Sequence, residues 1–144
     1  MQTTDSTPIL KILSVSPFQD DHRTLQSIIG RSTWILFCAD RLAAAADILQ
    51  QEGISVVLCE RNITAGTWVD LLERITDLLH PPSVVVTSRL ADEQLWVEAL
   101  NLGAWDVLAK PFQPTEVLRS VKAAWQHWYN QIPTGPLHLV RAAS

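Results

Sequence analysis

The chain has 144 residues, of which 47% are hydrophobic and 18% are charged, a composition typical of one globular domain. The formal net charge is −4 and the eleven Lys and Arg residues do not cluster, so we expect no direct binding to nucleic acid. No apolar run approaches the roughly 18 residues of a membrane helix, and Met1–Pro8 lacks the features of a signal peptide. We therefore expect a cytoplasmic protein without membrane contact.

Short apolar runs alternate with segments of helical periodicity along the chain. The pattern predicts, in order, strand 9–15, helix 20–30, strand 34–38, helix 41–51, strand 54–59, helix 68–79, strand 83–87, helix 92–102, strand 106–109 and helix 114–129. The strands are continuously apolar, as in a parallel sheet covered by helices on both faces. This order predicts an α/β fold with a doubly wound, five-stranded parallel sheet of the flavodoxin type.

We expect one folded domain over residues 9–130, with residues 1–8 and 131–144 as flexible termini or a truncated linker. In such a sheet the functional crevice lies at the carboxyl ends of the strands. The residues that follow the predicted strands are Ser16, Pro17, Asp40, Glu60, Thr87, Ser88 and Lys110. The two cysteines, Cys38 and Cys59, lie inside apolar runs and without a CxxC motif, which favours buried thiols over a redox or metal site.

The segment Ala99–Phe112 (ALNLGAWDVLAKPF) combines a helix end, a Gly-Ala turn, a short strand and Lys-Pro-Phe. With the strand ending in Thr87 one helix earlier, it resembles the receiver domains of response regulators in bacterial two-component (phosphorelay) systems. The resemblance extends over about 9–130 and implies a (βα)₅ receiver fold. In the family an Asp after the third strand accepts a phosphoryl group, and acids after the first strand help to hold Mg²⁺. By resemblance, Thr87 and Lys110 are the remaining phosphoryl-binding residues, and the bond from Lys110 to Pro111 is cis.

The other positions of the family's phosphoryl-transfer site are altered. Ser16 and Pro17 stand where the acid pair is expected, so Mg²⁺ binding should be lost or weak, with no other cofactor. Glu60 aligns with the phosphoacceptor if the following loop is one residue shorter, whereas an ungapped alignment places Cys59 there. Nearby Asp20 and Asp21 are interpreted as first-turn helix residues, with displaced metal ligands as the alternative. No catalytic residue is assigned.

The aromatic switch residue of the family falls on Val107, whose side chain cannot carry the usual ring rotation. We therefore expect a degenerate, non-enzymatic receiver domain that acts by phosphorylation-independent protein–protein interaction, with Glu60 mimicking phosphorylation or making it irrelevant. One alternative is a phosphoacceptor that uses an atypical site near Cys59 or Glu60; another is a small-ligand module. The expected interface for a protein partner, an output domain or a second copy lies on the fourth and fifth helices and fifth strand, at Trp96, Trp105 and Trp128.

Overall fold

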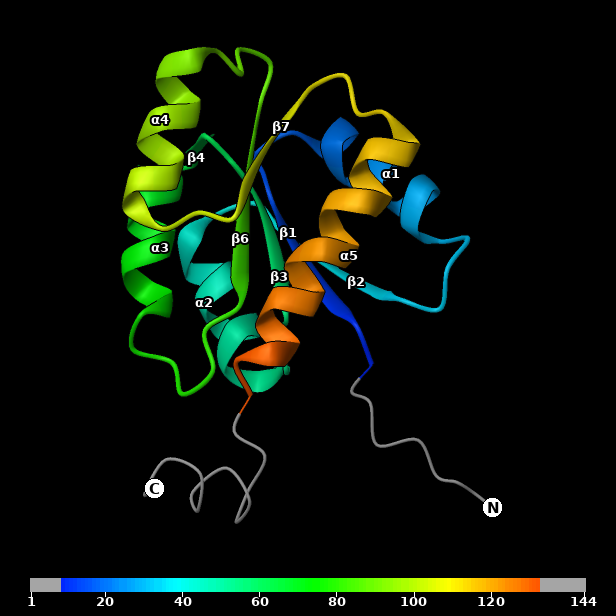
Figure 1. The fold of residues 1–144 in the computed structure, drawn as a ribbon, viewed down its shortest axis with the longest axis vertical. Helices are drawn as coiled ribbons and strands as arrows, with labels where there is room; N and C mark the ends of the chain where they lie inside the picture. Colours follow the sequence, from blue (N-terminus) through cyan, green and yellow to red (C-terminus); the bar gives the residue numbers. More distant parts are fainter. Residues whose placement is uncertain (1–8, 133–144) are drawn as a thin grey trace.

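A computed structural model describes residues 9–132, and the termini predicted to be flexible lie almost entirely outside this range. The main sheet consists of five parallel strands in the order β2-β1-β3-β6-β7 (Figure 1). Its strands are β1 (Lys11–Val15), β2 (Ile35–Ala39), β3 (Val56–Glu60), β6 (Ser83–Ser88) and β7 (Asp106–Ala109). The helices are α1 (Gln19–Ile29), α2 (Leu42–Gln51), α3 (Trp68–Ile75), α4 (Glu93–Leu102) and α5 (Pro114–Asn130). The predicted fold class is confirmed.

Two hydrophobic cores hold the helices against opposite faces of the sheet. One core joins the sheet to α2, α3 and α4, and Trp68 and Leu95 are buried in it. The other joins it to α1 and α5, through residues such as Leu25 and Val121. β1, β3 and β6 are buried along almost their entire lengths because helices cover both faces, which explains their unbroken apolar sequences.

Two local features differ from the sequence prediction. The helix α3 ends at Ile75 rather than at 79, and Leu79, which extended the apolar periodicity, is largely exposed. The exit loop after β3 contains a short antiparallel ribbon of β4 (Asn62–Ile63) and β5 (Gly66–Thr67). The turn between them places Ala65 at a φ of 63°, a left-handed conformation that is unfavourable for a residue with a Cβ. Within residues 9–132 no helix has the length and apolarity needed to cross a bilayer.

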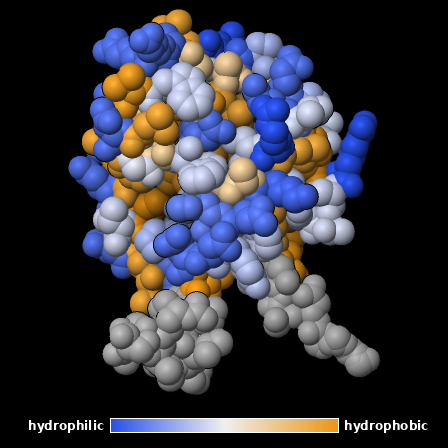
Figure 2. Space-filling model, in the orientation of Figure 1, coloured by the Kyte–Doolittle hydropathy of each residue, from blue (hydrophilic) through white to orange (hydrophobic). Residues whose placement is uncertain are grey.

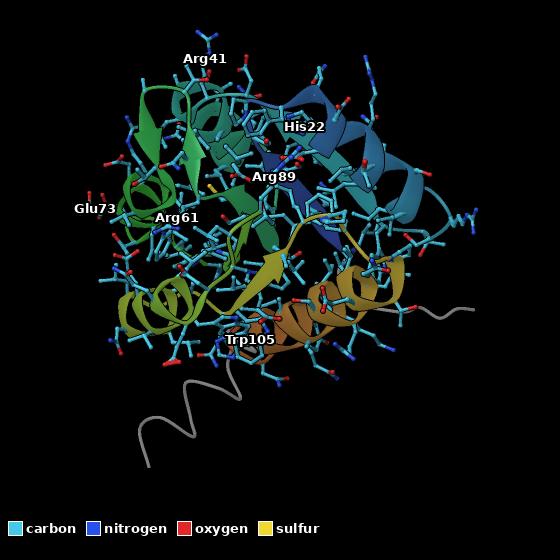
Figure 3. All side chains as sticks on the ribbon, turned by 90° about the horizontal axis from the view of Figure 1, so that it is seen from above. His22, Arg41, Arg61, Glu73, Arg89 and Trp105 are labelled. Carbon is cyan, nitrogen blue, oxygen red and sulfur yellow. The ribbon has the colours of Figure 1, made fainter. Side chains whose placement is uncertain are left out.

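The register of the sheet determines which side chains meet at its carboxyl edge. Glu60, the last residue of β3, pairs with Thr87 on β6, and the backbone N–H of Lys110 bonds to the carbonyl of Ser88. Figure 3 views this edge from above, with His22 and Arg89 near its centre. Residues from α1, β3, β6 and β7 therefore converge at the predicted crevice.

Candidate functional site

Lys110 lies at the centre of the crevice and bridges two carboxylates. Its Nζ is 2.6 Å from Glu60 Oε1 and 2.8 Å from Asp21 Oδ2. The three side chains are 6%, 9% and 11% exposed, so the cluster is largely removed from water. The peptide bond from Lys110 to Pro111 is cis, as the family resemblance implied. A pocket of about 450 Å³ opens beside the cluster, between the start of α1 and the segment after β7.

Glu60 contacts both groups that were predicted to bind phosphoryl oxygens. Its Oε1 accepts a hydrogen bond of 3.3 Å from the Thr87 hydroxyl in addition to the contact with Lys110. Cys59, the alternative at this position, belongs to the core shared with α2, α3 and α4, and its thiol donates to the backbone oxygen of Glu60. Burial raises the pKa of the Cys59 thiol far above its ordinary value. Among the two candidate residues, the structure thus brings Glu60 into the crevice and keeps Cys59 out of it.

Asp21 has a role that the sequence analysis did not assign to it. It lies in the first turn of α1, as predicted, but its side chain is buried and turned toward Lys110, whereas the neighbouring Asp20 is exposed and pairs with Arg23. The helical period contained this signal, because Asp21 lies four residues before the buried Leu25 and shares its face. The partner could not be deduced, since it is 89 residues away in the chain.

Ser16 and His22 fix the end of β1 beneath Asp21. The Ser16 hydroxyl donates to Asp21 Oδ2 at 2.7 Å and accepts a bond from the backbone N–H of Phe18. Its carbonyl lies 2.9 Å from His22 Nε2, and His22 Nδ1 lies 3.0 Å from the hydroxyl of Ser14. The Nε2–H tautomer satisfies this set, with Nε2 donating to the carbonyl and Nδ1 accepting from the serine hydroxyl. Ser16 therefore orients Asp21 directly, while Ser14 and His22 hold the backbone of Ser16 at the end of β1.

Comparisons with known proteins address the family and the fold of the chain. The model of the response regulator receiver domain matches residues 12–122. The chain belongs to this family. It is 37% identical over 87 residues to the transcriptional regulatory protein FixJ of Rhizobium meliloti, covering 60% of this chain and 40% of that protein. It is 25% identical over 110 residues to the hydrogenase transcriptional regulatory protein HoxA of Bradyrhizobium diazoefficiens, covering 74% of this chain and 23% of that protein.

Solved receiver domains share the fold of this chain. A signal receiver domain of an HD domain-containing protein from Pseudomonas fluorescens superposes with a TM-score of 0.78 at 21% identity, covering 86% of this chain and all of the other. A CheY-like receiver domain protein from Methanospirillum hungatei gives 0.76 at 18% identity, with 87% and 100% covered. The chain spans less than half the length of these two curated relatives, FixJ and HoxA. It is a response regulator receiver domain of the kind used in two-component systems.

The donor set in the crevice does not match what Mg²⁺ requires. Mg²⁺ prefers carboxylate and water oxygens in octahedral geometry, but an oxygen of each carboxylate here already binds the Lys110 ammonium. Ser16 offers a hydroxyl that is engaged with Asp21, and Pro17 is exposed and has no side-chain donor. Within residues 9–132 no group of three or more His, Cys, Asp or Glu side chains is placed to hold a metal ion. The cluster is built around an ammonium group.

The residues predicted for switching and partner contact belong to α4, β7 and α5, with Trp105 directly before β7. Val107 is buried in the core beneath α4. Trp96 and Trp105 are 37% and 38% exposed. Trp128 is less exposed than either, and its indole N–H is enclosed. Trp96 and Trp105, rather than Trp128, are thus the more exposed rings. Val97 and Leu100 are further exposed hydrophobic side chains of α4. Apolar side chains lie among polar ones on the surface over α4 in Figure 2.

Proposed function

We propose that this receiver domain transmits signals through protein contacts without accepting a phosphoryl group, and that it does so in the cytoplasm and not as an enzyme. The observation that carries the proposal is the bridge from Lys110 to Glu60 and Asp21, at 2.6 and 2.8 Å. The bridge supplies within the chain the negative charge that a phosphoryl group brings to this crevice in the family. The bridge consists of side chains of the chain itself, so the proposed state does not depend on a phosphodonor.

Glu60 stands at the phosphoacceptor position in this proposal. It ends β3, and the same carboxylate oxygen binds Lys110 and Thr87, the two residues expected to contact phosphoryl oxygens. A glutamate is one methylene longer than an aspartate, which allows its carboxylate to reach toward the place of the phosphoryl group. We infer that Glu60 holds Thr87 and Lys110 as a phosphorylated residue would.

Phosphoryl transfer to Glu60 lacks two physical requirements. The carboxylate oxygen that faces Lys110 is already paired with its ammonium, so it is a weakened nucleophile. Transfer also needs cationic stabilisation of the developing charge, and the residues at the end of β1 provide no carboxylate pair for Mg²⁺. Weak or absent Mg²⁺ binding is therefore part of the proposal. An atypical phosphoacceptor at Glu60 is the alternative that the following experiment separates from it.

The full chain is incubated with a small phosphodonor and Mg²⁺, and its intact mass is measured with and without hydroxylamine. We expect no added phosphoryl group. The matched control is the variant Ser16→Asp/Pro17→Asp/Glu60→Asp, which restores the family's carboxylates and should gain a hydroxylamine-sensitive phosphoryl group. Stoichiometric, hydroxylamine-sensitive phosphorylation of the natural chain would show that Glu60 or another residue is a working phosphoacceptor.

The partner surface in this proposal is the α4–β7–α5 face, with Trp96 and Trp105 as anchors. Trp96 shares α4 with the exposed side chains of Val97 and Leu100, and Trp105 is exposed just before β7. Exposed apolar side chains of this kind mark protein interfaces, and truncating an aromatic anchor often costs about 2 kcal/mol or more of binding. An output domain, a separate protein or a second copy of the chain are the occupants to distinguish. Trp96→Ala should weaken self-association or partner binding in sedimentation without changing the melting temperature. A lower melting temperature with unchanged association would instead assign Trp96 to the fold.

A further inference from the structure

The outer edge of β2 lacks the protection that the opposite edge of the sheet carries. β2 and β7 form the two edges of the sheet (Figure 1). On β7 the carboxylate of Asp106 accepts a hydrogen bond of 2.8 Å from the Val107 N–H, and Pro111 follows the strand closely. Charge and proline are common means by which proteins prevent an edge from pairing with another strand. Residues 32–39, which contain β2, include neither.

The backbone of β2 presents free hydrogen-bonding groups along this edge. Within the part of the chain that the structure describes, β2 pairs with β1 alone. The Ile35 N–H and the Ala39 carbonyl both bond to residues that flank β1. Because bonding to one neighbour falls on every second residue of a parallel strand, Phe37 also bonds toward β1, whereas Leu36 and Cys38 direct their N–H and C=O groups outward.

The side chains along this edge are apolar and accessible to solvent. Ile35 is 39% exposed, and Leu36, Phe37 and Cys38 are half-buried. None of them is charged, so two copies of the strand can lie side by side without the repulsion that opposed like charges cause. An edge with free backbone groups and apolar side chains is a template for a further strand.

We propose that β2 pairs in antiparallel orientation with β2 of a second copy of this chain, which joins the two sheets into one. The two-fold axis passes beside Phe37, so Leu36 of each copy lies opposite Cys38 of the other, and these two residues exchange their free N–H and C=O bonds. In this register the charged residues that follow β2, Asp40 and Arg41, lie opposite neutral residues of the other copy. The contact lies at the edge opposite β7 and is independent of the α4–β7–α5 face.

Cysteine crosslinking tests both the pairing and its register. Directly opposed, hydrogen-bonded residues of antiparallel strands have Cα atoms about 5.5 Å apart, within the range of a disulfide. Leu36→Cys adds a thiol opposite the natural Cys38 of the second copy, so mild oxidation should convert this variant into a covalent dimer on non-reducing electrophoresis. The matched control Leu36→Cys/Cys38→Ala removes the opposed thiol and should lose the crosslink. The natural chain should not crosslink either, because its two Cys38 residues lie about 8 Å apart in this register, beyond the reach of a disulfide.

Sedimentation without oxidation tests the non-covalent contact in the natural full chain, which should form a concentration-dependent dimer. Ile35→Lys places a charge on the exposed edge and should abolish this dimer, with far-UV circular dichroism to confirm that the variant is folded. The matched variant Ile35→Val keeps an apolar, β-branched side chain and should still dimerise.

Two results would overturn the proposal. One is a natural chain that sediments as a monomer at every concentration, which would leave the edge to a strand of another protein. The other is a crosslink that forms as efficiently in the natural chain or in Leu36→Cys/Cys38→Ala as in Leu36→Cys, because neither of those thiol pairs is opposed in the proposed register.

Discussion

The buried bridge around Lys110 predicts a large loss of stability when its positive charge is removed. At 2.6 and 2.8 Å, each contact corresponds to about 6 kcal/mol of attraction for an effective dielectric constant near 20. Desolvation of the three ions cancels much of this, but Lys110→Met leaves Asp21 and Glu60 buried without a counter-charge. Breaking a buried pair in this way costs about 3–5 kcal/mol. We expect the free energy of unfolding to fall by that amount.

Urea denaturation followed by far-UV circular dichroism measures this change. The matched control is Lys11→Met, whose ion pair with Glu52 spans 3.4 Å with side chains 29% and 35% exposed, and which should cost less than about 1 kcal/mol. Adding Glu60→Gln to Lys110→Met should restore about 1–2 kcal/mol, because it removes one of the two repelling charges. The electrostatic explanation is refuted if Lys110→Met costs no more than Lys11→Met, or if Glu60→Gln restores nothing in that background.

Three further predictions follow from single residues. Ala65→Gly should raise the free energy of unfolding by about 0.5–1 kcal/mol, because glycine adopts the φ of 63° without a steric penalty; an unchanged denaturation midpoint would contradict this. Asp21→Asn should destabilise the fold by about 1–3 kcal/mol, whereas Asp20→Asn, on an exposed side chain, should stay within about 0.5 kcal/mol. Iodoacetamide at mildly alkaline pH should modify Cys38 before Cys59, because burial raises the pKa of Cys59 much further and leaves less thiolate; peptide mass spectrometry showing Cys59 modified first would disprove the assignment.

The helices, the main strands and the family could be predicted because each depends on patterns within short, continuous stretches of sequence. Continuous apolar runs predicted the strands of a covered parallel sheet, and the segment from Ala99 to Phe112 predicted the turn and the short strand before Lys110. The cis bond from Lys110 to Pro111 was implied by the resemblance to receiver domains. The family assignment is confirmed by the match over residues 12–122. The end of α3 was misplaced because periodicity alone cannot tell a helical residue from an exposed one such as Leu79.

Of the three residues in the bridge, the sequence placed Glu60 and Lys110 at the crevice but did not identify Asp21 as their neighbour. The nearness of Glu60 and Lys110 follows from topology, since Glu60 ends β3 and Lys110 directly follows β7 at the same edge of the sheet. Asp21 required the rotation of α1 about its axis and the reach of Lys110 from the other end of the chain, and both depend on tertiary packing. The ribbon formed by β4 and β5 was not predicted because its strands have two residues each, too few to give a detectable pattern of hydrophobicity.

The most direct measurement of the central claim is a titration of the ¹⁵N-labelled full chain with Mg²⁺ and then with beryllofluoride, an analogue of the phosphoryl group. The backbone resonances of Ser16, Glu60, Thr87 and Lys110 surround the crevice and report on any occupant. With Lys110 held by Glu60 and Asp21, these resonances should stay in place at millimolar concentrations of both reagents. Saturable shifts centred on Glu60 that require Mg²⁺ would show that the crevice still binds metal and phosphoryl groups, and would contradict a permanently closed bridge.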